Sequence, residues 1–238
     1  MPKKGQFDTM NIPSDLSEYS VPQRDRLAFI ELLLFFMGDL RRSDIVSRFG
    51  IQSAAATRDL SIYKKLAPSN IEYDTKEKTY VLGQAFKPLF QFSPERVLSW
   101  ITQSFGDGEP AQLKSWLATD TPARLTQPAL DTLSVVTRAI HQHSVLSMHY
   151  HSLSSGLTQR EIVPFALIDN GQRWHVRAYD RHHQDFRDFV ITRIQHPQLL
   201  KDSTIQPHEL SDQDIQWTRI VELDLVPHPD QPRPEITE

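Results

Sequence analysis

Basic and aromatic side chains alternate with apolar ones in a short stretch of the second half of the chain. The residues concerned are Arg173, His175, Arg177, Tyr179, Arg187 and Arg193. Alternate residues of a β-strand share one face, so this spacing predicts that the side chains converge on one surface. Guanidinium groups bind phosphate through paired hydrogen bonds, and flat rings stack on bases. The pattern therefore indicates a site for a phosphate, a nucleotide or a nucleic acid. The alternative is a solvated face whose charge is balanced by Asp180, Asp185 and Asp188.

A second basic group lies in the first half of the chain. Between residues 41 and 66, six bases stand against two acids, which is a local charge of +4 in a chain whose net charge is −4. The bases are Arg41, Arg42, Arg48, Arg58, Lys64 and Lys65. A local basic patch steers polyanions, whereas total charge mainly governs solubility. The alternative is the solvated face of a helix. The sequence pattern around these bases is needed to choose between the two interpretations.

Composition excludes several classes of protein. The 238 residues contain no cysteine, which rules out a disulfide scaffold, a thiol nucleophile and a cysteine-ligated metal site. The longest apolar run, residues 32–37, is far too short to span a membrane. Residues 1–11 lack the apolar segment of a signal peptide. We therefore expect a cytoplasmic protein with no membrane contact.

The sequence contains no complete catalytic or metal-binding signature. His149 and His151 would share a strand face, but a metal site usually needs three or four ligands with supporting hydrogen bonds. The chain has no GxSxG turn, no P-loop and no GxGxxG motif. We expect no metal, no cofactor and no catalytic residue, and hence a protein that is not an enzyme.

The first ninety residues have the pattern of a winged helix-turn-helix. Apolar residues recur at helical spacing, and Gly50 stands between two short helical segments. A polar turn at residues 75–78 then separates two alternating segments, which would form the wing. The expected helices are 22–37, 43–49 and 54–66, and the expected wing strands are 71–74 and 79–82.

The helix at 54–66 would enter the major groove of DNA. Its outward side chains are small or polar, which allows close approach, and Arg58 would read bases. Basic residues around it and at the wing tip would hold phosphates. The predicted DNA-binding residues are Arg42, Gln52, Ser53, Ala55, Thr57, Arg58, Ser61, Lys64, Lys65, Lys76 and Lys78. The alternative is a helix-turn-helix that contacts protein.

Beyond the wing, the hydrophobic period is helical to about residue 143 and alternating after it, which predicts a small barrel or sandwich. Its fourth strand is expected over 186–194, and a last strand over 216–226. The fold class is α+β with several domains. The expected segments are a flexible arm (1–20), the winged helix-turn-helix (21–92), a helical connector (93–143), the β domain (144–196) and a C-terminal segment (197–238).

The β domain resembles that of WYL-domain regulators. Trp174–His175–Val176 stands where that family carries its Trp-Tyr-Leu signature. The runs 173–179 and 186–190 are similar to a narrower group, the BrxR/CapW-type repressors of phage-defence operons such as BREX and CBASS. The resemblance covers roughly residues 23–226. The surrounding positions that match are Tyr150, Ser152, Arg160, Pro164, Arg187, Phe189, Thr192, Arg193 and Ile194.

This resemblance implies an Sm-like, SH3-type β-barrel that senses a nucleic-acid or nucleotide-type ligand. The ligand-binding residues that it implies are Tyr150, Ser152, Arg160, His175, Arg177, Arg187 and Arg193. The chain departs from the signature at His175 and Val176, and the charge of a histidine ring can vary with pH. Pro227–His228–Pro229 matches the turn that opens a C-terminal extension in the family, so a partial extension with a remnant strand is expected before Glu238.

The predicted function is that of a dimeric, sequence-specific transcriptional regulator, namely a repressor of a phage-defence operon. Its partners would be a palindromic double-stranded operator, a nucleotide or single-stranded nucleic-acid effector, and a second copy of the chain. Residues 197–238 carry three bases and nine acids, so this segment should lie away from the operator. The alternative is a nucleotide- or nucleic-acid-binding accessory protein of a defence system without promoter function.

Overall fold

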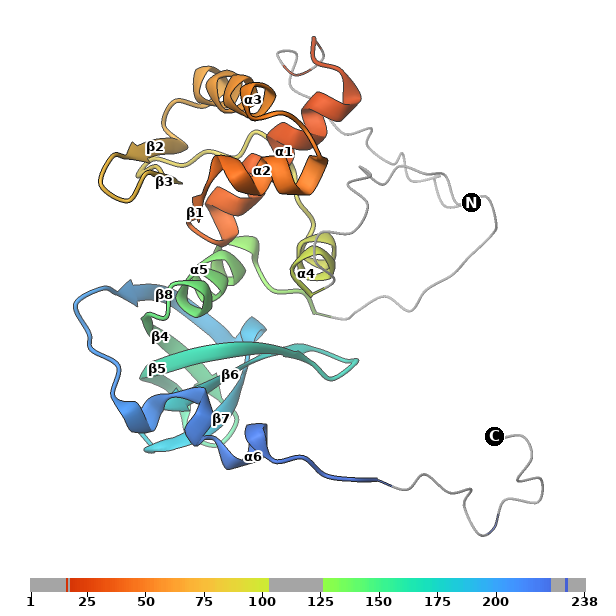
Figure 1. Ribbon diagram of the computed structural model, residues 1–238. Coiled ribbons are helices and arrows are strands. Elements are labelled where there is room, and N and C mark those ends of the chain that lie inside the picture. The colour runs from red at the N-terminus through yellow and green to blue at the C-terminus, as the bar shows by residue number, and fades with distance from the viewer. Residues whose placement is uncertain (1–15, 17, 103–125, 224–229, 231–238) are drawn as a thin grey trace, which may run out of the picture.

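The computed structural model describes residues 16, 18–102, 126–223 and 230, and Figure 1 shows a helical module and a β module with helices between them. The strands of the first module are antiparallel in the order β1-β3-β2. Its elements are α1 (Val21–Phe36), β1 (Asp39–Leu40), α2 (Arg42–Phe49), α3 (Ser53–Leu66), β2 (Ile71–Asp74) and β3 (Thr79–Leu82). The predicted order of a winged helix-turn-helix is confirmed.

The tight turn between α2 and α3 depends on Gly50. This residue has a φ of +62°, and its N–H donates to the carbonyl of Val46 at 2.9 Å. A side chain at this left-handed φ would be strained, so glycine suits the end of α2. The turn brings the apolar sides of the three helices into one core. Its buried members include Leu27, Ile30, Leu34, Ile45, Ala56, Leu60 and Tyr63.

Two further helices, α4 (Pro94–Thr102) and α5 (Leu130–His141), connect the modules. The last carbonyl groups of a helix have no hydrogen-bond partners within that helix. Side chains at the end of α5 supply hydrogen-bond donors to these carbonyl groups of α1. Thr137 Oγ1 donates to the carbonyl of Phe36 at 2.7 Å, and Arg138 Nη1 donates to that of Phe35 at 2.6 Å. Gln142 Nε2 donates to the carbonyl of Met37 at 3.1 Å. The helix that rests on the β module thus caps the first helix of the other module.

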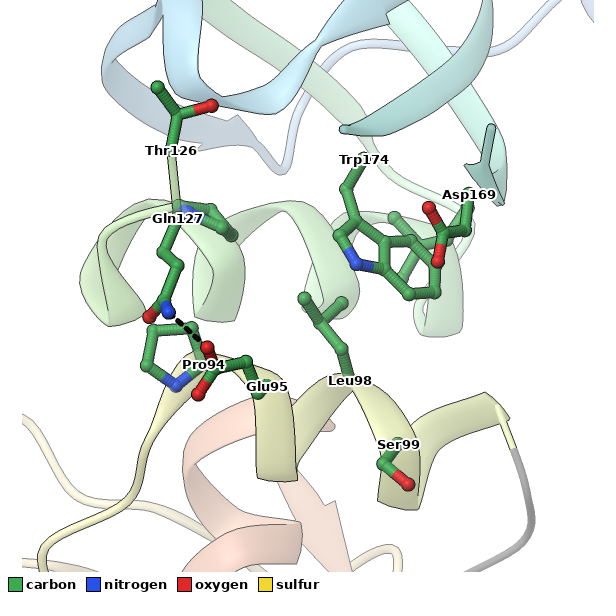
Figure 2. Close-up of a pocket in the computed structure, with 10 residues that line it drawn as sticks. Pro94, Glu95, Leu98, Ser99, Thr126, Gln127, Asp169 and Trp174 are labelled. Carbon is green, nitrogen blue, oxygen red and sulfur yellow. Dashed lines mark hydrogen bonds between the residues drawn. The ribbon is translucent and has the colours of Figure 1, made fainter. Parts of the chain in front are cut away.

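The two modules also share a hydrophobic core. Leu32 and Phe36 of α1 pack with Val97 and Leu98 of α4, with Leu133 of α5 and with Ile191 after the fourth strand of the β module. Beside this core, a cavity of about 400 Å³ opens between α4 and the ends of two strands of the β module (Figure 2). The junction between the modules is therefore packed on one side and hollow on the other.

The β module is built on an antiparallel five-stranded sheet within residues 145–200, in the order β7-β6-β5-β4-β8. Its strands are β4 (Val145–Ser152), β5 (Gly156–Asp169), β6 (Trp174–Asp180), β7 (Asp185–Val190) and β8 (Ile194–Leu200). The sheet is curled, and this is seen in the contact between Tyr150 of β4 and the edge strand β7. Its Oη accepts a hydrogen bond from the N–H of Val190 at 3.2 Å, and its ring lies edge-on to Phe189. The predicted α+β fold class is confirmed.

The predicted fourth strand is wrong in its second half. The strand β7 ends at Val190, residues Ile191–Arg193 form a 3₁₀ turn, and a further strand, β8, begins at Ile194. The apolar side chain of Ile191 leaves the sheet at this turn and enters the core shared by the modules. The strand β8 extends past the predicted boundary at residue 196. It was not predicted, because its sequence contains Pro197 and several polar residues.

The predicted strand at 216–226 is also wrong over its described part, residues 216–223. The chain instead forms 3₁₀ turns, η3 (Pro207–Glu209) and η4 (Ser211–Gln213), and a short helix, α6 (Ile215–Thr218). Asp214 explains the helix, since its side chain caps the N–H groups of Gln216 and Trp217. We call residues 201–218 the C-terminal strap.

Several predictions fall on residues that are not described. They include most of the flexible arm (1–15 and 17), the middle of the connector (103–125) and the end of the chain (224–229 and 231–238). At the end of the expected arm, Leu16 is buried in the core of the first module, and Tyr19 packs against it. The first module therefore begins before residue 21.

Candidate nucleic-acid interface and ligand site

The predicted DNA-binding residues lie on the turn and the outer side of α3, with outliers on α2 and the wing. All of them are exposed except Ala55, which is half-buried. Arg42 Nη1 donates to Thr57 Oγ1 at 3.2 Å, which ties α2 to α3. Thr57 Oγ1 in turn donates to the carbonyl of Ser53 at 2.9 Å. The helix-turn-helix therefore presents one polar and basic face to solvent.

The acidic residue of α3 points the other way. Asp59 is 1 % exposed, and its Oδ2 lies 2.6 Å from Arg26 Nε on α1. Gln23 Nε2 donates to the other oxygen at 3.1 Å. Because Asp59 is paired internally, the solvent face of α3 keeps its bases, among them Arg58 and Lys64, without an acidic neighbour from the same helix.

A buried carboxyl group supports α3 from behind. Tyr63 Oη donates to Glu31 Oε2 at 2.8 Å, and Asn70 Nδ2 donates to Tyr63 Oη at 3.2 Å. The N–H groups of Leu89 and Phe90 also donate to Glu31, at 3.0 and 2.8 Å. Burial raises the pKa of Glu31 to about 7, although these hydrogen bonds act to lower it. Sequence reasoning missed this residue, because its partners are distant in the chain.

The wing tip is shaped by its own acid. Asp74 Oδ1 accepts hydrogen bonds from the N–H groups of Lys76 and Glu77, at 2.8 and 3.1 Å. Lys78 has a positive φ of +52°. Both lysines are exposed. Beside them, the rings of Tyr73 and Tyr80 lie 4.9 Å apart, and Tyr73 is exposed, a feature that the sequence interpretation did not include.

In the β module, strand register divides the predicted ligand-binding residues between two faces. Residues directly paired across antiparallel strands share a face. Arg160 pairs with Met148 and Thr158 pairs with Tyr150, both of which lie in the core inside the curl. Ser152 follows Tyr150 at strand spacing. The inner group therefore contains Tyr150, Ser152 and Arg160.

Arg187 joins this inner group through its register. It pairs with Ala178, a member of the core inside the curl. Its side chain is exposed and makes no hydrogen bond or ion pair with another described residue. Arg193 is half-buried and lies in the 3₁₀ turn rather than on the strand of Arg187, so the prediction that these two residues share a strand face is wrong.

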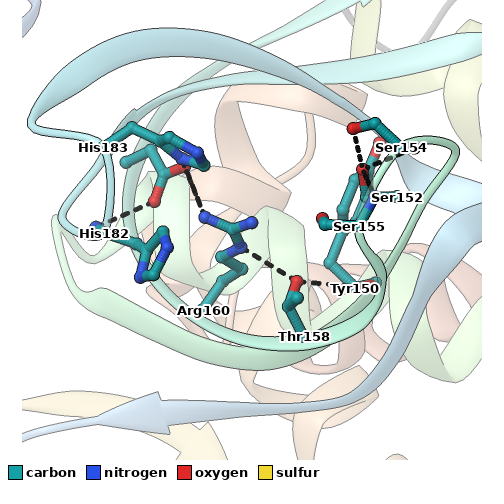
Figure 3. A network of polar contacts seen from close by, with 9 residues as sticks. Tyr150, Ser152, Ser154, Ser155, Thr158, Arg160, His182 and His183 are labelled. Atoms are coloured by element: carbon teal, nitrogen blue, oxygen red, sulfur yellow. Dashed lines mark hydrogen bonds and ion pairs between the residues drawn. The ribbon is translucent and has the colours of Figure 1, made fainter.

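The side chain of Arg160 is the centre of a polar network (Figure 3). Its Nε donates to Thr158 Oγ1 at 3.0 Å, and its Nη1 lies 3.3 Å from Asp180 Oδ2. His183 Nδ1 approaches both groups, at 2.8 Å from Arg160 Nη1 and 2.6 Å from the Asp180 carboxylate. Arg160 Nη2 makes no hydrogen bond to any described residue. One edge of a positioned guanidinium is thus left for an outside acceptor.

Hydroxyl groups extend the network on its other side. Ser152 Oγ lies 3.1 Å from Ser154 Oγ and accepts the N–H groups of Ser154 and Ser155, both at 3.3 Å. Figure 3 shows these serines across the curl from His182 and His183, with Arg160 between them. Donors from β4, β5 and the turn after β6 are therefore collected at one end of the curled sheet.

His175 and Arg177 lie on the opposite face of β6. Their neighbour Tyr179 packs there with Val163 and Phe186, outside the curl. The predicted convergence of all the candidates on one surface is therefore wrong. It failed because the alternation within β6 was extended to strands whose register was unknown.

Arg177 already has protein partners. Its Nε and Nη2 donate to the two carboxylate oxygens of Asp214 in the C-terminal strap, at 2.7 and 3.0 Å. Nη2 also donates to Gln216 Oε1 at 3.1 Å, and Asp188 lies 3.4 Å from Nη1. Hydrogen bonding to Asp214 raises the pKa of Arg177. Burial acts to raise the pKa of Asp214, but the bonds and charge of Arg177 bring that pKa below its usual value.

A second ion pair fixes the strap. Arg181 Nε and Nη2 donate to the two oxygens of Glu209, at 2.7 and 2.9 Å, and Arg181 Nη1 donates to Ser203 Oγ at 2.7 Å. Ring contacts join the strap to the sheet, between Trp217 and Phe165 and between His208 and Tyr179. The outer face of β5, β6 and β7 is therefore covered by the chain itself.

The fold and these two faces define a regulator with a winged-helix domain and a WYL domain. Residues 22–103 match the BrxR transcriptional regulator winged helix-turn-helix domain, and residues 131–199 match the WYL domain. The DNA-binding transcriptional repressor CapW of Pseudomonas aeruginosa is 34 % identical over 215 residues, which cover 87 % of this chain and 70 % of that protein. The CapW repressors of Escherichia coli and Stenotrophomonas maltophilia are 31 % and 32 % identical, with the same coverage.

The chain belongs to the family of the CapW repressors. The resemblance to WYL-domain and BrxR/CapW-type regulators is thereby confirmed. The prediction that the chain is not an enzyme agrees with this family, whose members matched here are DNA-binding transcriptional repressors.

Two solved structures are similar to this chain only at low identity and low TM-score. The proteasome accessory factor PafBC of Arthrobacter aurescens is 17 % identical with a TM-score of 0.31, covering 86 % of this chain and 37 % of that one. A CRISPR Cas-related protein is 11 % identical with a TM-score of 0.29, covering 36 % and 27 % of the two chains. The family assignment rests on the sequence relatives.

In the part of the chain that the structure describes, no helix has the length and apolar character that crossing a membrane requires. Nor do the described residues bring together three or more histidine, aspartate or glutamate side chains in a way that would hold a metal ion.

Proposed function

We propose that this protein is a DNA-binding transcriptional repressor of a phage-defence operon of the BREX or CBASS type. It would bind a palindromic operator as a homodimer, with one α3 in each of two successive major grooves. The names of its CapW relatives support the repressor function. The proposal takes the operon type and the dimer from the family resemblance, and the interface from the residues themselves.

The observation that carries DNA binding is the solvent face of α3. Arg58, Lys64 and Lys65 are exposed there, while the acidic Asp59 is turned inward and paired with Arg26. Small and hydroxyl side chains at the start of the helix allow the backbone to approach base edges. An exposed basic helix after a tight turn, with a lysine-bearing wing beside it, fits recognition of double-stranded DNA.

Binding to the DNA upstream of the protein's own gene tests this function. We expect a gel shift at protein concentrations at which random DNA of equal length is not shifted. Arg58→Ala should weaken binding to the upstream DNA by about tenfold or more, with a smaller loss on random DNA, if Arg58 reads a base. Lys201→Ala, which removes an exposed base outside the interface, is the control. Equal affinity of the native chain for both DNAs would instead favour the accessory-protein function.

We further propose that the inner group of the WYL domain binds the phosphate of a nucleotide or nucleic acid. Arg160 is held by Thr158 and Asp180 with Nη2 left over, and Arg187 is exposed on the same face. Serine hydroxyls stand opposite them. A positioned guanidinium edge with hydroxyl donors around it favours binding of a phosphate oxygen, whereas a site lined by carboxylates would repel it.

This ligand site can be tested with probes of known chemistry. ATP and a single-stranded thymidine octamer would be titrated into the full chain. Arg187→Gln should weaken probe binding by about fivefold, as expected for losing one charge-assisted contact, while operator affinity is kept. Lys201→Gln removes the same charge elsewhere and should change neither. Probe binding that is unchanged in Arg187→Gln would argue against a phosphate site at the inner group. Arg193, in the 3₁₀ turn, remains a proposed ligand contact, and Arg193→Gln tests it separately.

A further inference from the structure

We propose that His183 sets the anion affinity of the inner group, because its ring holds Arg160 when neutral and releases it on taking up a proton. This rests on the proposed function of the inner group as a phosphate site. His183 lies in the turn between β6 and β7 and is not among the ligand-binding residues predicted from the sequence. It is a positioning residue, since it would act on the ligand through Arg160.

Two partners compete for one ring nitrogen of His183 (Figure 3). Its Nδ1 lies 2.8 Å from Arg160 Nη1 and 2.6 Å from Asp180 Oδ2. A guanidinium N–H only donates hydrogen bonds, and an ionised carboxylate only accepts them. An imidazole nitrogen carries either a lone pair or a hydrogen, so Nδ1 can satisfy one of these partners but not both at once. The geometry therefore allows two alternative hydrogen-bond arrangements around this atom.

In the first arrangement, Nδ1 carries the lone pair and accepts a hydrogen bond from Arg160. The guanidinium also donates through Nε to Thr158 Oγ1, and its Nη1 lies 3.3 Å from Asp180 Oδ2. The charges of Arg160 and Asp180 cancel, and the ring adds none. Arg160 Nη1 is then shared by two protein partners, and Nη2 is the group left for a ligand.

In the second arrangement, the ring has taken up a proton and Nδ1 donates to Asp180. Arg160 Nη1 no longer finds an acceptor on the ring, so this nitrogen becomes available beside Nη2. The three side chains together now carry one positive charge. An anion gains from both changes, because it meets a wider guanidinium edge and a positive field. A bound phosphate in turn stabilises the imidazolium, so binding and proton uptake are linked.

The surroundings of the ring allow this change near neutral pH. The side chain of His183 is 35 % exposed, so water can deliver the proton, whereas Asp180 beside it is 1 % exposed. Within the described structure, the charged and titratable groups that contact the ring are Arg160, Asp180 and His182, whose ring centre lies 4.8 Å away. A protonated His182 would oppose protonation of His183 by repulsion. Imidazole side chains change charge between about pH 5 and about pH 8.

The test is the affinity of the full chain for the single-stranded thymidine octamer at about pH 8 and about pH 6. The phosphodiesters of this probe keep their charge over the whole range. We expect the affinity of the native chain to rise by about fivefold as the pH falls, the size expected of one linked proton. Isothermal titration in two buffers of different ionisation enthalpy should show proton uptake on binding.

Matched variants of the two neighbouring histidines locate the linked proton. Glutamine offers both a donor and an acceptor but does not titrate, so His183→Gln should lose the pH dependence. His182→Gln removes the adjacent exposed histidine and should keep the pH dependence of the native chain. Urea denaturation checks that both variants are folded. Equal pH dependence in the native chain and in His183→Gln would overturn the proposal.

The ring of His183 can also be observed directly. Long-range nitrogen–proton NMR correlations distinguish a neutral imidazole from an imidazolium. On saturation with the octamer at about pH 7, the ring nitrogen signals of His183 should move toward those of the imidazolium. Octamer binding that leaves this ring unchanged, or that is equal at both pH values, would overturn the role of His183 and leave the phosphate site standing. No octamer binding at either pH would contradict the phosphate site itself, and this proposal with it.

Discussion

At Glu31, a carboxyl group is buried in α1 and receives hydrogen bonds from α3 and from the segment before α4. Burial raises its pKa from 4.5 to about 7. The folded chain therefore binds this proton more tightly than the unfolded chain does. The stabilisation is fully present below about pH 4.5 and is lost as the pH rises through about 7. The support behind the recognition helix thus weakens near neutral pH.

We predict that Glu31 alone lowers the free energy of unfolding by about 2 kcal/mol between pH 5 and pH 8. In Glu31→Gln this part of the pH dependence should vanish, although the amide places an N–H against the donors of Leu89 or Phe90 and lowers stability at every pH. Urea denaturation of both chains at the two pH values measures the difference. Glu72→Gln, on the exposed side of β2, is the control. An unchanged slope in Glu31→Gln would contradict the prediction.

The residue scale also shows where sequence reasoning about the site stops. The types of residue at the DNA-binding face were predictable, because helical periodicity alone places Arg58 and Ser61 outward. The ligand site was not, because Arg160 and Arg177 look equivalent in sequence. Only the pairing of β5 with β4 and of β6 with β7 puts one inside the curl and the other beneath the strap.

At the scale of elements, α5 matters most because it closes the end of α1. Thr137 Oγ1 is buried and donates to the carbonyl of Phe36. We predict that Thr137→Val, which keeps the shape but removes the donor, lowers the free energy of unfolding by about 1–2 kcal/mol by leaving that carbonyl unpaired. Urea denaturation would measure the loss. Thr192→Val changes an exposed threonine in the same way and should stay within about 0.5 kcal/mol of the native chain. Equal effects would argue against the cap.

The strap is a second element whose attachment can be tested. Asp214 is 2 % exposed and holds Arg177 in a buried pair, and removal of one partner of such a pair costs about 3 kcal/mol or more. We predict that Asp214→Asn releases the strap, since asparagine can still cap α6 but cannot neutralise Arg177. Trypsin cleavage after Lys201 and Arg219, followed by mass spectrometry, should become several-fold faster. Asp212→Asn, on the exposed side of η4, is the control. Native-like cleavage of Asp214→Asn would show that Glu209 and the ring contacts hold the strap alone.

The elements that the sequence predicted are those with local signals. The helices α1 to α3 and both wing strands follow from periodicity, Gly50 and a polar turn. The strand β8 carries polar residues and Pro197, so nothing local marks it, and it forms only because β4 offers an open edge. Residues 216–223, which begin at the end of the strap, resembled a strand because their apolar and polar side chains alternate. Asp214 instead caps a helix at residues 215–218 and pairs with Arg177, far earlier in the chain. The structure of both segments is set by pairing with distant residues, which local sequence patterns do not reveal.

At the scale of the whole molecule, the DNA-binding face and the C-terminal strap lie at opposite ends. Figure 1 places α3 and the wing at one end and the C-terminal strap at the other. The exposed bases of α3 therefore lie far from the strap, residues 201–218, which carry four acids and one base. This arrangement removes the conflict between a net charge of −4 and an interface for DNA, because the field near the DNA is set by the nearer charges.

Rigidity between the modules has a consequence for the proposed operator. The core shared by α1, α4, α5 and Ile191, together with the α5 cap on α1, opposes rotation of the winged helix relative to the β module. If two copies are joined through any part of the β module or the strap, the distance between their recognition helices is then fixed. A fixed distance demands a fixed separation and phase of the half-sites along the DNA.

We therefore predict that insertion of about five base pairs, half a helical turn, between the half-sites of the palindrome lowers affinity by at least about a hundredfold, toward that of a single half-site. The second winged helix would then face the wrong side of the duplex. Fluorescence anisotropy with the native and the expanded operator measures the loss, and an operator with one half-site scrambled supplies the reference. Equal affinity for the native and expanded operators would mean that the two winged helices move independently, and the shared core would then not couple them.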